Sequence, residues 1–139
     1  MRPRLILDTN VVISGLLLFG GPPGVVLDLA LEGVVELATS SSLVTELERV
    51  LQNKFPHAQQ AIWDTVATLK EVAISTIPQE PVDVIAEDPS DNRVLECALS
   101  AHVEAIVSGD KHLLALKVFR GIPILSPQAF LLRWRQEHR

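Results

Sequence analysis

Short runs of apolar residues alternate with longer stretches of helical periodicity along the whole chain, and this alternation limits the possible folds more than any other feature. The predicted strands are residues 4–8, 34–38, 72–77, 105–107 and 122–125. The predicted helices are residues 11–19, 24–31, 43–54, 57–71, 89–101 and 113–118, with a last helix that begins at Pro127. Strands separated by helices predict an α/β fold, a three-layer α/β/α sandwich with a mostly parallel central sheet.

The length and composition indicate one globular domain that spans residues 1–139, because no internal repeat or linker interrupts the pattern. The single cysteine, Cys97, cannot form an internal disulfide, which favours the cytoplasm. No apolar run approaches the roughly 20 residues that span a bilayer, so we expect no membrane partner. The apolar stretch after the charged N-terminus has no small-residue cleavage site, and we therefore expect no signal peptide.

The net charge of −5, from 17 acids and 12 bases, argues on its own against a sequence-independent nucleic-acid binder, which should be basic. The argument weakens if several acids are metal ligands. Neutralising four carboxylates would leave a charge of about −1. The total charge therefore does not exclude a nucleic-acid substrate.

Two aspartates stand at the ends of predicted strands. Asp8 ends the first strand, and Asp110 follows the 105–107 strand after a Ser-Gly turn. Either one could simply cap the helix that follows. Ligands of parallel sheets bind beyond the carboxyl ends of the strands, however, and here two strands deliver an acid to the same edge. This coincidence favours a functional site.

Asp91 is the most informative acid, because it falls on the apolar face of its helix. Val94, Leu95 and Ala98 all lie within about 60° of it on a helical projection. A buried carboxylate must be paired, neutralised or bound to metal. The alternative is a capping box, with Asp88 at the N-cap, Pro89 at N1 and Asp91 at N3. Capping explains the residue types but not the choice of the apolar face.

The helix at 43–54 offers a further acid, although periodicity cannot choose it. Glu46 and Glu48 flank the apolar stripe of this helix on opposite sides. A glutamate on a helix surface is usually just solvated. From periodicity alone, neither residue is singled out.

Four segments, taken together, are similar to a known family. They are Leu7–Asn10, Ser41–Leu47, Asp88–Arg93 and Ser108–Leu113. In this order, and at these junctions of strand and helix, they resemble the PIN-domain family, in particular the group assigned as toxin components of toxin–antitoxin systems. The resemblance covers essentially the whole chain.

The resemblance implies a set of site residues. Its acidic cluster, catalytic and metal-binding, would be Asp8, Glu46, Asp91 and Asp110, with Asn10 and Ser108 in support. It implies one or two Mg²⁺ or Mn²⁺ ions, of which Mg²⁺ prefers oxygen ligands and keeps several waters. Because the acids repel one another without metal, at least one of their pKa values should rise.

The implied activity is a divalent-metal-dependent endoribonuclease that hydrolyses RNA phosphodiester bonds as the toxin of a toxin–antitoxin pair. Arg93 and Lys111, each beside an acid, are candidates for contacts with the RNA backbone. The arginines near the two termini could form a basic patch if the termini meet, and ordinary surface charge is the simpler interpretation. The apolar stretch 11–31 could be a patch covered by an antitoxin or by a second copy in a homodimer, or else a buried helix pair.

Other functions fit the sequence less well. A non-catalytic PIN module that binds RNA or protein is the main alternative, and the presence of all four acids argues against it. An aspartate-nucleophile phosphatase needs a second aspartate two residues after the first, where this chain has Asn10. Receiver domains and flap-type DNA nucleases differ further, in strand order and in size respectively.

Overall fold

The computed structural model describes residues 2–18 and 20–138, and within them one six-stranded sheet forms the centre of the molecule. The strand order is β3-β2-β1-β4-β6-β5. The strands are β1 (Arg4–Leu7), β2 (Glu36–Thr39), β3 (Ile74–Ser75), β4 (Ala105–Val107), β5 (Val118–Phe119) and β6 (Ile122–Leu125). All neighbouring strands are parallel except β5, which runs antiparallel to β6. The predicted α/β architecture with a mostly parallel sheet is confirmed.

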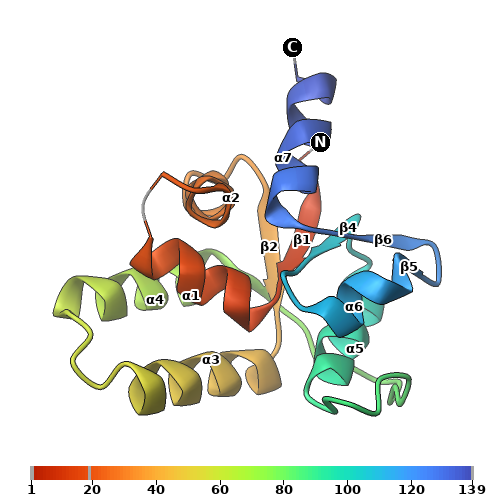
Figure 1. The fold of residues 1–139 in the computed structure, drawn as a ribbon, viewed down its shortest axis with the longest axis horizontal. Helices are drawn as coiled ribbons and strands as arrows, with labels where there is room; N and C mark the ends of the chain where they lie inside the picture. Colours follow the sequence, from red (N-terminus) through yellow and green to blue (C-terminus); the bar gives the residue numbers. More distant parts are fainter. Residues whose placement is uncertain (1, 19, 139) are drawn as a thin grey trace.

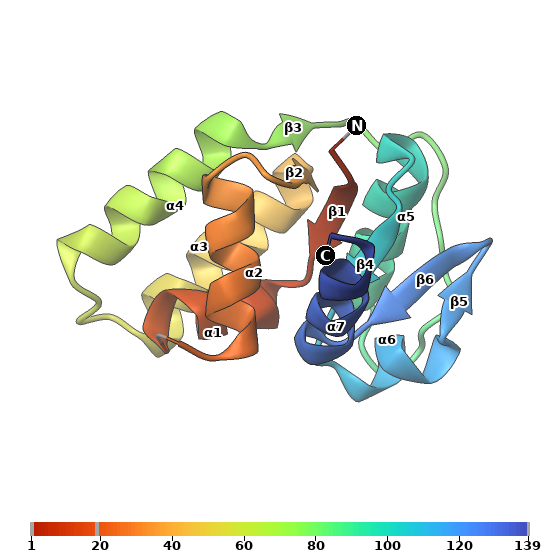
Figure 2. The ribbon, with the colours of Figure 1, turned by 90° about the horizontal axis from the view of Figure 1, so that it is seen from above.

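Helices cover both faces of the sheet (Figures 1 and 2). They are α1 (Thr9–Leu17), α2 (Pro22–Leu31), α3 (Ser41–Lys54), α4 (Gln60–Val72), α5 (Asp91–Ala101), α6 (Lys111–Leu116) and α7 (Pro127–Glu137). Alternate residues of β1 enter different cores: Leu5 and Leu7 pack with α1, α2, α4 and α7, whereas Ile6 packs with α5 and α6. This alternation is the period of two that a strand imposes.

Most predicted elements occur within two or three residues of their expected bounds, but two expectations were wrong. The predicted strand 72–77 is reduced to the two residues of β3. The predicted helix 113–118 ends at Leu116, and Val118 belongs to β5 instead. Lys117 adopts a positive φ of 62° and ends the helix, and the positive φ values of Arg120 and Gly121 close a tight hairpin between β5 and β6.

The apolar stretch 11–31 forms the helix pair α1–α2, most of whose large side chains are buried in the core. Phe19, the predicted end of the first helix, lies outside the described residues. In the part of the chain that the structure describes, no single helix has the length and apolar composition needed to cross a membrane.

Candidate metal centre

The site lies at the carboxyl ends of β1 and β4, which pair in parallel so that Leu7 stands opposite Val107. Asp8 follows β1 directly and caps α1, with its Oδ1 accepting a hydrogen bond of 2.8 Å from the Thr9 amide. Asp110 follows β4 and caps α6, with its Oδ1 accepting from two amides of the first turn. Both acids are therefore caps, as the simpler interpretation predicted, and capping engages only one oxygen of each.

Ser108 connects these two acids. Its hydroxyl donates to Asp8 Oδ2 at 2.8 Å and accepts from the Asp110 amide at 2.9 Å. The side chain is fully buried. Ser108 therefore fixes the Asp8 carboxylate relative to the turn that follows β4.

Asp91 is the first residue of α5 and only 5% exposed, so the prediction that it faces inward is confirmed. Its Oδ2 is buried and has no hydrogen-bond partner. The alternative of a capping box does not occur, because the N-cap position falls on Ser90 and Asp91 is N1. Asp88 instead accepts hydrogen bonds from the amide and the hydroxyl of Ser90 in the turn before the helix.

These acids line one cavity of about 350 Å³. Its lining includes all four predicted acids and Asn10, joined by Asp88, Ser90, Arg49 and Lys54. In Figure 1 the carboxyl end of β1 lies at the centre of the molecule, with α1 and α6 on either side and α3 and α5 beside them. Residues separated by up to 102 positions in the sequence thus share one acidic hollow.

Within this cavity, Asp88, Asp91 and Asp110 come closest together, each with one carboxylate oxygen within 4.8 Å of the others. Asp8 and Glu46 line the same cavity without belonging to that group. From the residue pattern, Asp88 was interpreted only as a helix cap. The available signal was the spacing of Asp88 and Asp91, which places both carboxylates in one turn.

Burial and mutual repulsion raise two of the pKa values. Burial, chiefly, raises the pKa of Asp8, with smaller contributions from Asp110 and Glu46, while the hydrogen bonds from Ser108 and Thr9 oppose the rise. Burial also raises the pKa of Asp91 to about 7, and the charges of Asp110, Asp8 and Asp88 add to this effect. Such repulsion among clustered carboxylates is what a bound cation relieves.

A family model described as the PIN domain matches residues 4–112. The chain belongs to the PIN-domain family. This PIN domain is 29% identical over 121 residues to the uncharacterized protein MJ1680 of Methanocaldococcus jannaschii, a match that covers 84% of this chain and 77% of that protein. PIN domains are generally nucleases, and they generally use divalent metals.

The fold of this PIN domain is similar to the crystal structure of PAE2754 from Pyrobaculum aerophilum. The TM-score is 0.58 at 16% sequence identity, over 97% of this chain and 90% of that chain. At this identity the likeness concerns the fold, and it agrees with the family match in confirming the predicted PIN-like architecture.

The residues of the acidic cavity fit a divalent metal. Every titratable donor group at its centre is a carboxylate, the ligand type that Mg²⁺ and Mn²⁺ prefer. The buried Oδ2 of Asp91 lacks a protein partner, which a cation would supply. Which of the acids bind the ion, and how many ions there are, remain predictions.

The cations at this PIN domain's cavity differ from the expected ones. Arg93 pairs with Glu96 at 2.9 Å and donates to the Val82 carbonyl at 3.2 Å, so its guanidinium is engaged elsewhere. Neither Arg93 nor Lys111 is among the lining residues, whereas Arg49 and Lys54 of α3 are. Arg49 is three residues after Glu46 and therefore shares its face of the helix, a spacing that the sequence analysis did not use.

Two of the arginines near the termini, Arg2 and Arg4, stand at the other edge of the sheet from the acids. Arg2 and Arg4 both pair with Glu36, at 3.4 and 3.6 Å. These residues stand at the amino end of β1, opposite the edge that bears the acids. Their pairing favours the interpretation as ordinary surface charges.

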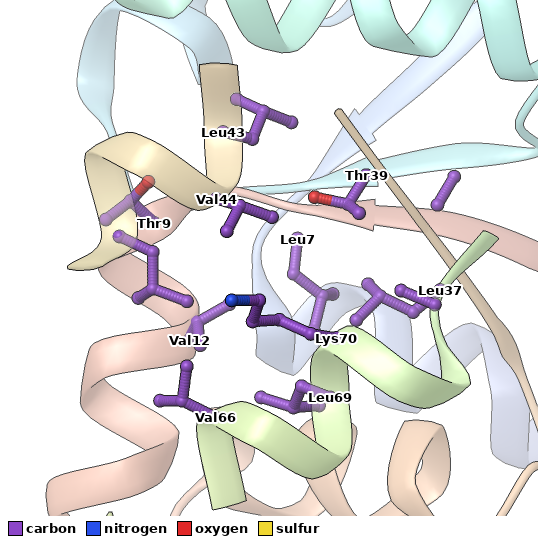
Figure 3. A pocket seen from close by; sticks show the side chains of 13 residues that line it. Leu7, Thr9, Val12, Leu37, Thr39, Leu43, Val44, Val66, Leu69 and Lys70 are labelled. Carbon is purple, nitrogen blue, oxygen red and sulfur yellow. The ribbon is translucent and has the colours of Figure 1, made fainter. Parts of the chain in front are cut away.

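A second cavity lies between α1, α3 and α4 and is mostly apolar (Figure 3). Leucine and valine side chains form most of its wall, and the Lys70 side chain extends along it. Its volume is only about 40 Å³, and its lining contains no acid. The acidic cavity therefore offers carboxylate ligands for a metal ion, whereas this one does not.

Proposed function

We propose that this PIN domain is a divalent-metal-dependent endoribonuclease that hydrolyses RNA phosphodiester bonds. The observation that carries the proposal is the buried, unpartnered Oδ2 of Asp91 inside a cavity that four further acids line. A single-stranded RNA or an RNA loop is the substrate class that the resemblance to RNA-cleaving PIN domains favours.

In this proposal Asp8, Glu46, Asp91 and Asp110 hold one or two Mg²⁺ or Mn²⁺ ions. When bound, such an ion makes a neighbouring water a stronger nucleophile at neutral pH and neutralises charge on the leaving oxygen. The protein's own contribution is to orient the acids and to oppose the rise that burial causes in the pKa of Asp8. Ser108 does so for Asp8 by donating a hydrogen bond to its carboxylate.

The substrate phosphates would meet the positive side chains of α3. Arg49 and Lys54 line the cavity together with the acids and replace Arg93 and Lys111 as the proposed backbone contacts. Asn10, exposed at the rim, offers an amide to the same region. Because the cavity is otherwise acidic, these few cations would decide where an anionic strand can enter.

The proposal is tested by sequencing RNA ends after induction of the wild type or of Asp91→Asn in cells. New ends confined to the wild type are expected, and they would identify the reaction and the target together. Purified protein with Mn²⁺ and a synthetic single-stranded RNA provides the matching test in vitro. Identical ends from wild type and variant would contradict the proposal and favour a non-catalytic module.

We further propose that the protein is the toxin of a toxin–antitoxin pair and acts in the cytoplasm. A cognate antitoxin or a second copy of this chain would cover the apolar groove between α1, α2 and α4. Leu16, Leu27 and Ile62 line this groove, whose volume is about 350 Å³. Replacing Ile62 by Asp should release the partner without affecting RNA cleavage by the purified domain. Light scattering of the wild type and of Ile62→Asp, alone and with the co-expressed partner, measures this.

A further inference from the structure

Asp88 lies at the end of a loop, and its side chain lines the acidic cavity. It lies three residues before Asp91 and is half-buried. The hydrogen bonds that it accepts, from the amide and the hydroxyl of Ser90, both go to Oδ1. Its Oδ2 is therefore left for another partner.

Asp91 and Asp110, the two neighbours of Asp88 in the cavity, also have a carboxylate oxygen left for another partner. Asp110 uses Oδ1 to cap α6, and Asp91 buries an Oδ2 that has no hydrogen-bond partner. One oxygen from each of the three acids lies within 4.8 Å of the others. Ligand oxygens around one octahedral ion at about 2.1 Å are about 3–4.2 Å apart, so small side-chain adjustments would close such a set on a cation.

We infer that Asp88 is a fifth metal-binding acid and that Asp88, Asp91 and Asp110 hold one divalent ion directly. The inference deepens the proposed function, on which it rests for the ion. Asp8 and Glu46, which line the cavity outside this group, then bind through water or hold a second ion. The resemblance to PIN domains placed Asp91 and Asp110 in the acidic cluster but gave no role to Asp88.

The test compares Asp88→Asn with Glu87→Gln in the full chain. Asparagine keeps the Oδ1 that accepts the Ser90 hydrogen bonds and removes the charge. Glu87→Gln removes the same charge from the neighbouring exposed residue, which is not among the cavity residues. The Mn²⁺ dissociation constant is measured for each protein by titration calorimetry, with electron paramagnetic resonance of free Mn²⁺ as a second readout.

Loss of even an outer partner of a metal ligand costs about 10–100-fold in affinity. Asp88→Asn should therefore weaken Mn²⁺ binding at least about tenfold, whereas Glu87→Gln should stay within about twofold of the wild type. Equal affinities for Asp88→Asn and the wild type, or no Mn²⁺ binding by the wild type, would overturn the inference. A wild type that binds Mn²⁺ but cleaves no RNA would overturn the proposed function alone.

Thermal denaturation without metal distinguishes two roles of Asp88, metal binding and capping of the turn before α5. If Asp88 is one of several repelling acids, Asp88→Asn should melt at the same or a higher temperature than the wild type while losing Mn²⁺ affinity. Ser90→Ala, which removes the hydroxyl partner of Asp88, should lower the melting temperature and leave Asp88 Oδ2 available. A lower melting temperature for Asp88→Asn with unchanged Mn²⁺ affinity would show that Asp88 only caps the turn.

Discussion

A single hydroxyl in this PIN domain joins two acids that are 102 residues apart. Ser108 donates to Asp8 and accepts from the Asp110 amide, and it does so without contact with solvent. The hydrogen bond to Asp8 stabilises the charged carboxylate against the burial that raises its pKa. Under the proposed function, the affinity of Asp8 for a cation would therefore depend on Ser108.

Ser108→Ala should destabilise the domain by about 1–3 kcal/mol, because it leaves Asp8 Oδ2 and the Asp110 amide without their partner. The pKa of Asp8 should rise further, so Mn²⁺ binding should require a higher pH than in the wild type. Calorimetric Mn²⁺ titrations from pH 5 to pH 8 measure the shift. Ser126→Ala, which removes a comparable hydroxyl cap from α7, should leave this pH dependence unchanged.

Asp91 should make the metal-free domain less stable as the pH rises. Its pKa is about 7 in the folded protein and 3.8 as an unperturbed group, so between these values the folded state retains a proton that the unfolded state has lost. Stability then falls with rising pH across this window, and the loss is complete above about pH 7. Metal binding, which needs the ionised carboxylate, should strengthen across the same window.

Asp91→Asn removes this titration. The stability difference between variant and wild type should grow in favour of the variant from pH 4 to pH 8, by an amount on the order of a few kcal/mol. Urea denaturation at several pH values, with EDTA present, measures it. A difference that does not change with pH would show that Asp91 does not titrate in this range.

At the scale of elements, α5 organises the long loop that precedes it. Asn92 is 1% exposed and accepts hydrogen bonds from the amides of Val84 and Ile85, while its own amide donates to the Ile85 carbonyl at 2.8 Å. Glu96, one turn later, accepts from the Val82 amide. The helix thus holds the loop whose last residues, next to the start of α5, include Asp88.

Replacing Asn92 by Ala should remove three hydrogen bonds at once and cost about 2–4 kcal/mol. Hydrogen exchange at the amides of Val84 and Ile85 should accelerate far more than at the amides of β1 and β4, because the loop loses its anchor while the sheet does not. Nuclear magnetic resonance of the exchanging protein measures both sets. Equal acceleration everywhere would mean that Asn92 supports the domain as a whole.

Hydrophobic periodicity predicted some of the helices correctly and failed at others. Periodicity located α5 and the inward position of Asp91, because both depend on the spacing of apolar residues within one segment. It extended α6 through Val118, because the three positive φ values that end the helix and form the hairpin leave no apolar signal. It interpreted Asp88 as a helix cap, because the residue types before α5 do not show that the N-cap is Ser90.

At the scale of the whole molecule, the strand order decides what the site contains. The sequence predicted that two aspartates would lie at one edge of a parallel sheet, and the direct pairing of β1 with β4 brings them together. No local pattern encodes that pairing, nor the position of α3, which brings Glu46 and Arg49 to the same cavity. Glu46 was accordingly distinguished from Glu48 by the family resemblance and not by periodicity.

Because the acids follow β1 and β4, lie on α3 and stand at the start of α5, a cation bound among them should stabilise the entire domain and not one segment. Mn²⁺ or Mg²⁺ at 100 times its dissociation constant should add about 2.7 kcal/mol to the free energy of unfolding. Thermal denaturation at increasing metal concentration measures this, and EDTA should reverse it. Asp8→Asn should respond more weakly, because it removes one of the acids that the metal neutralises. An equal response in wild type and variant, or none in either, would mean that the five acids do not act together as a metal centre.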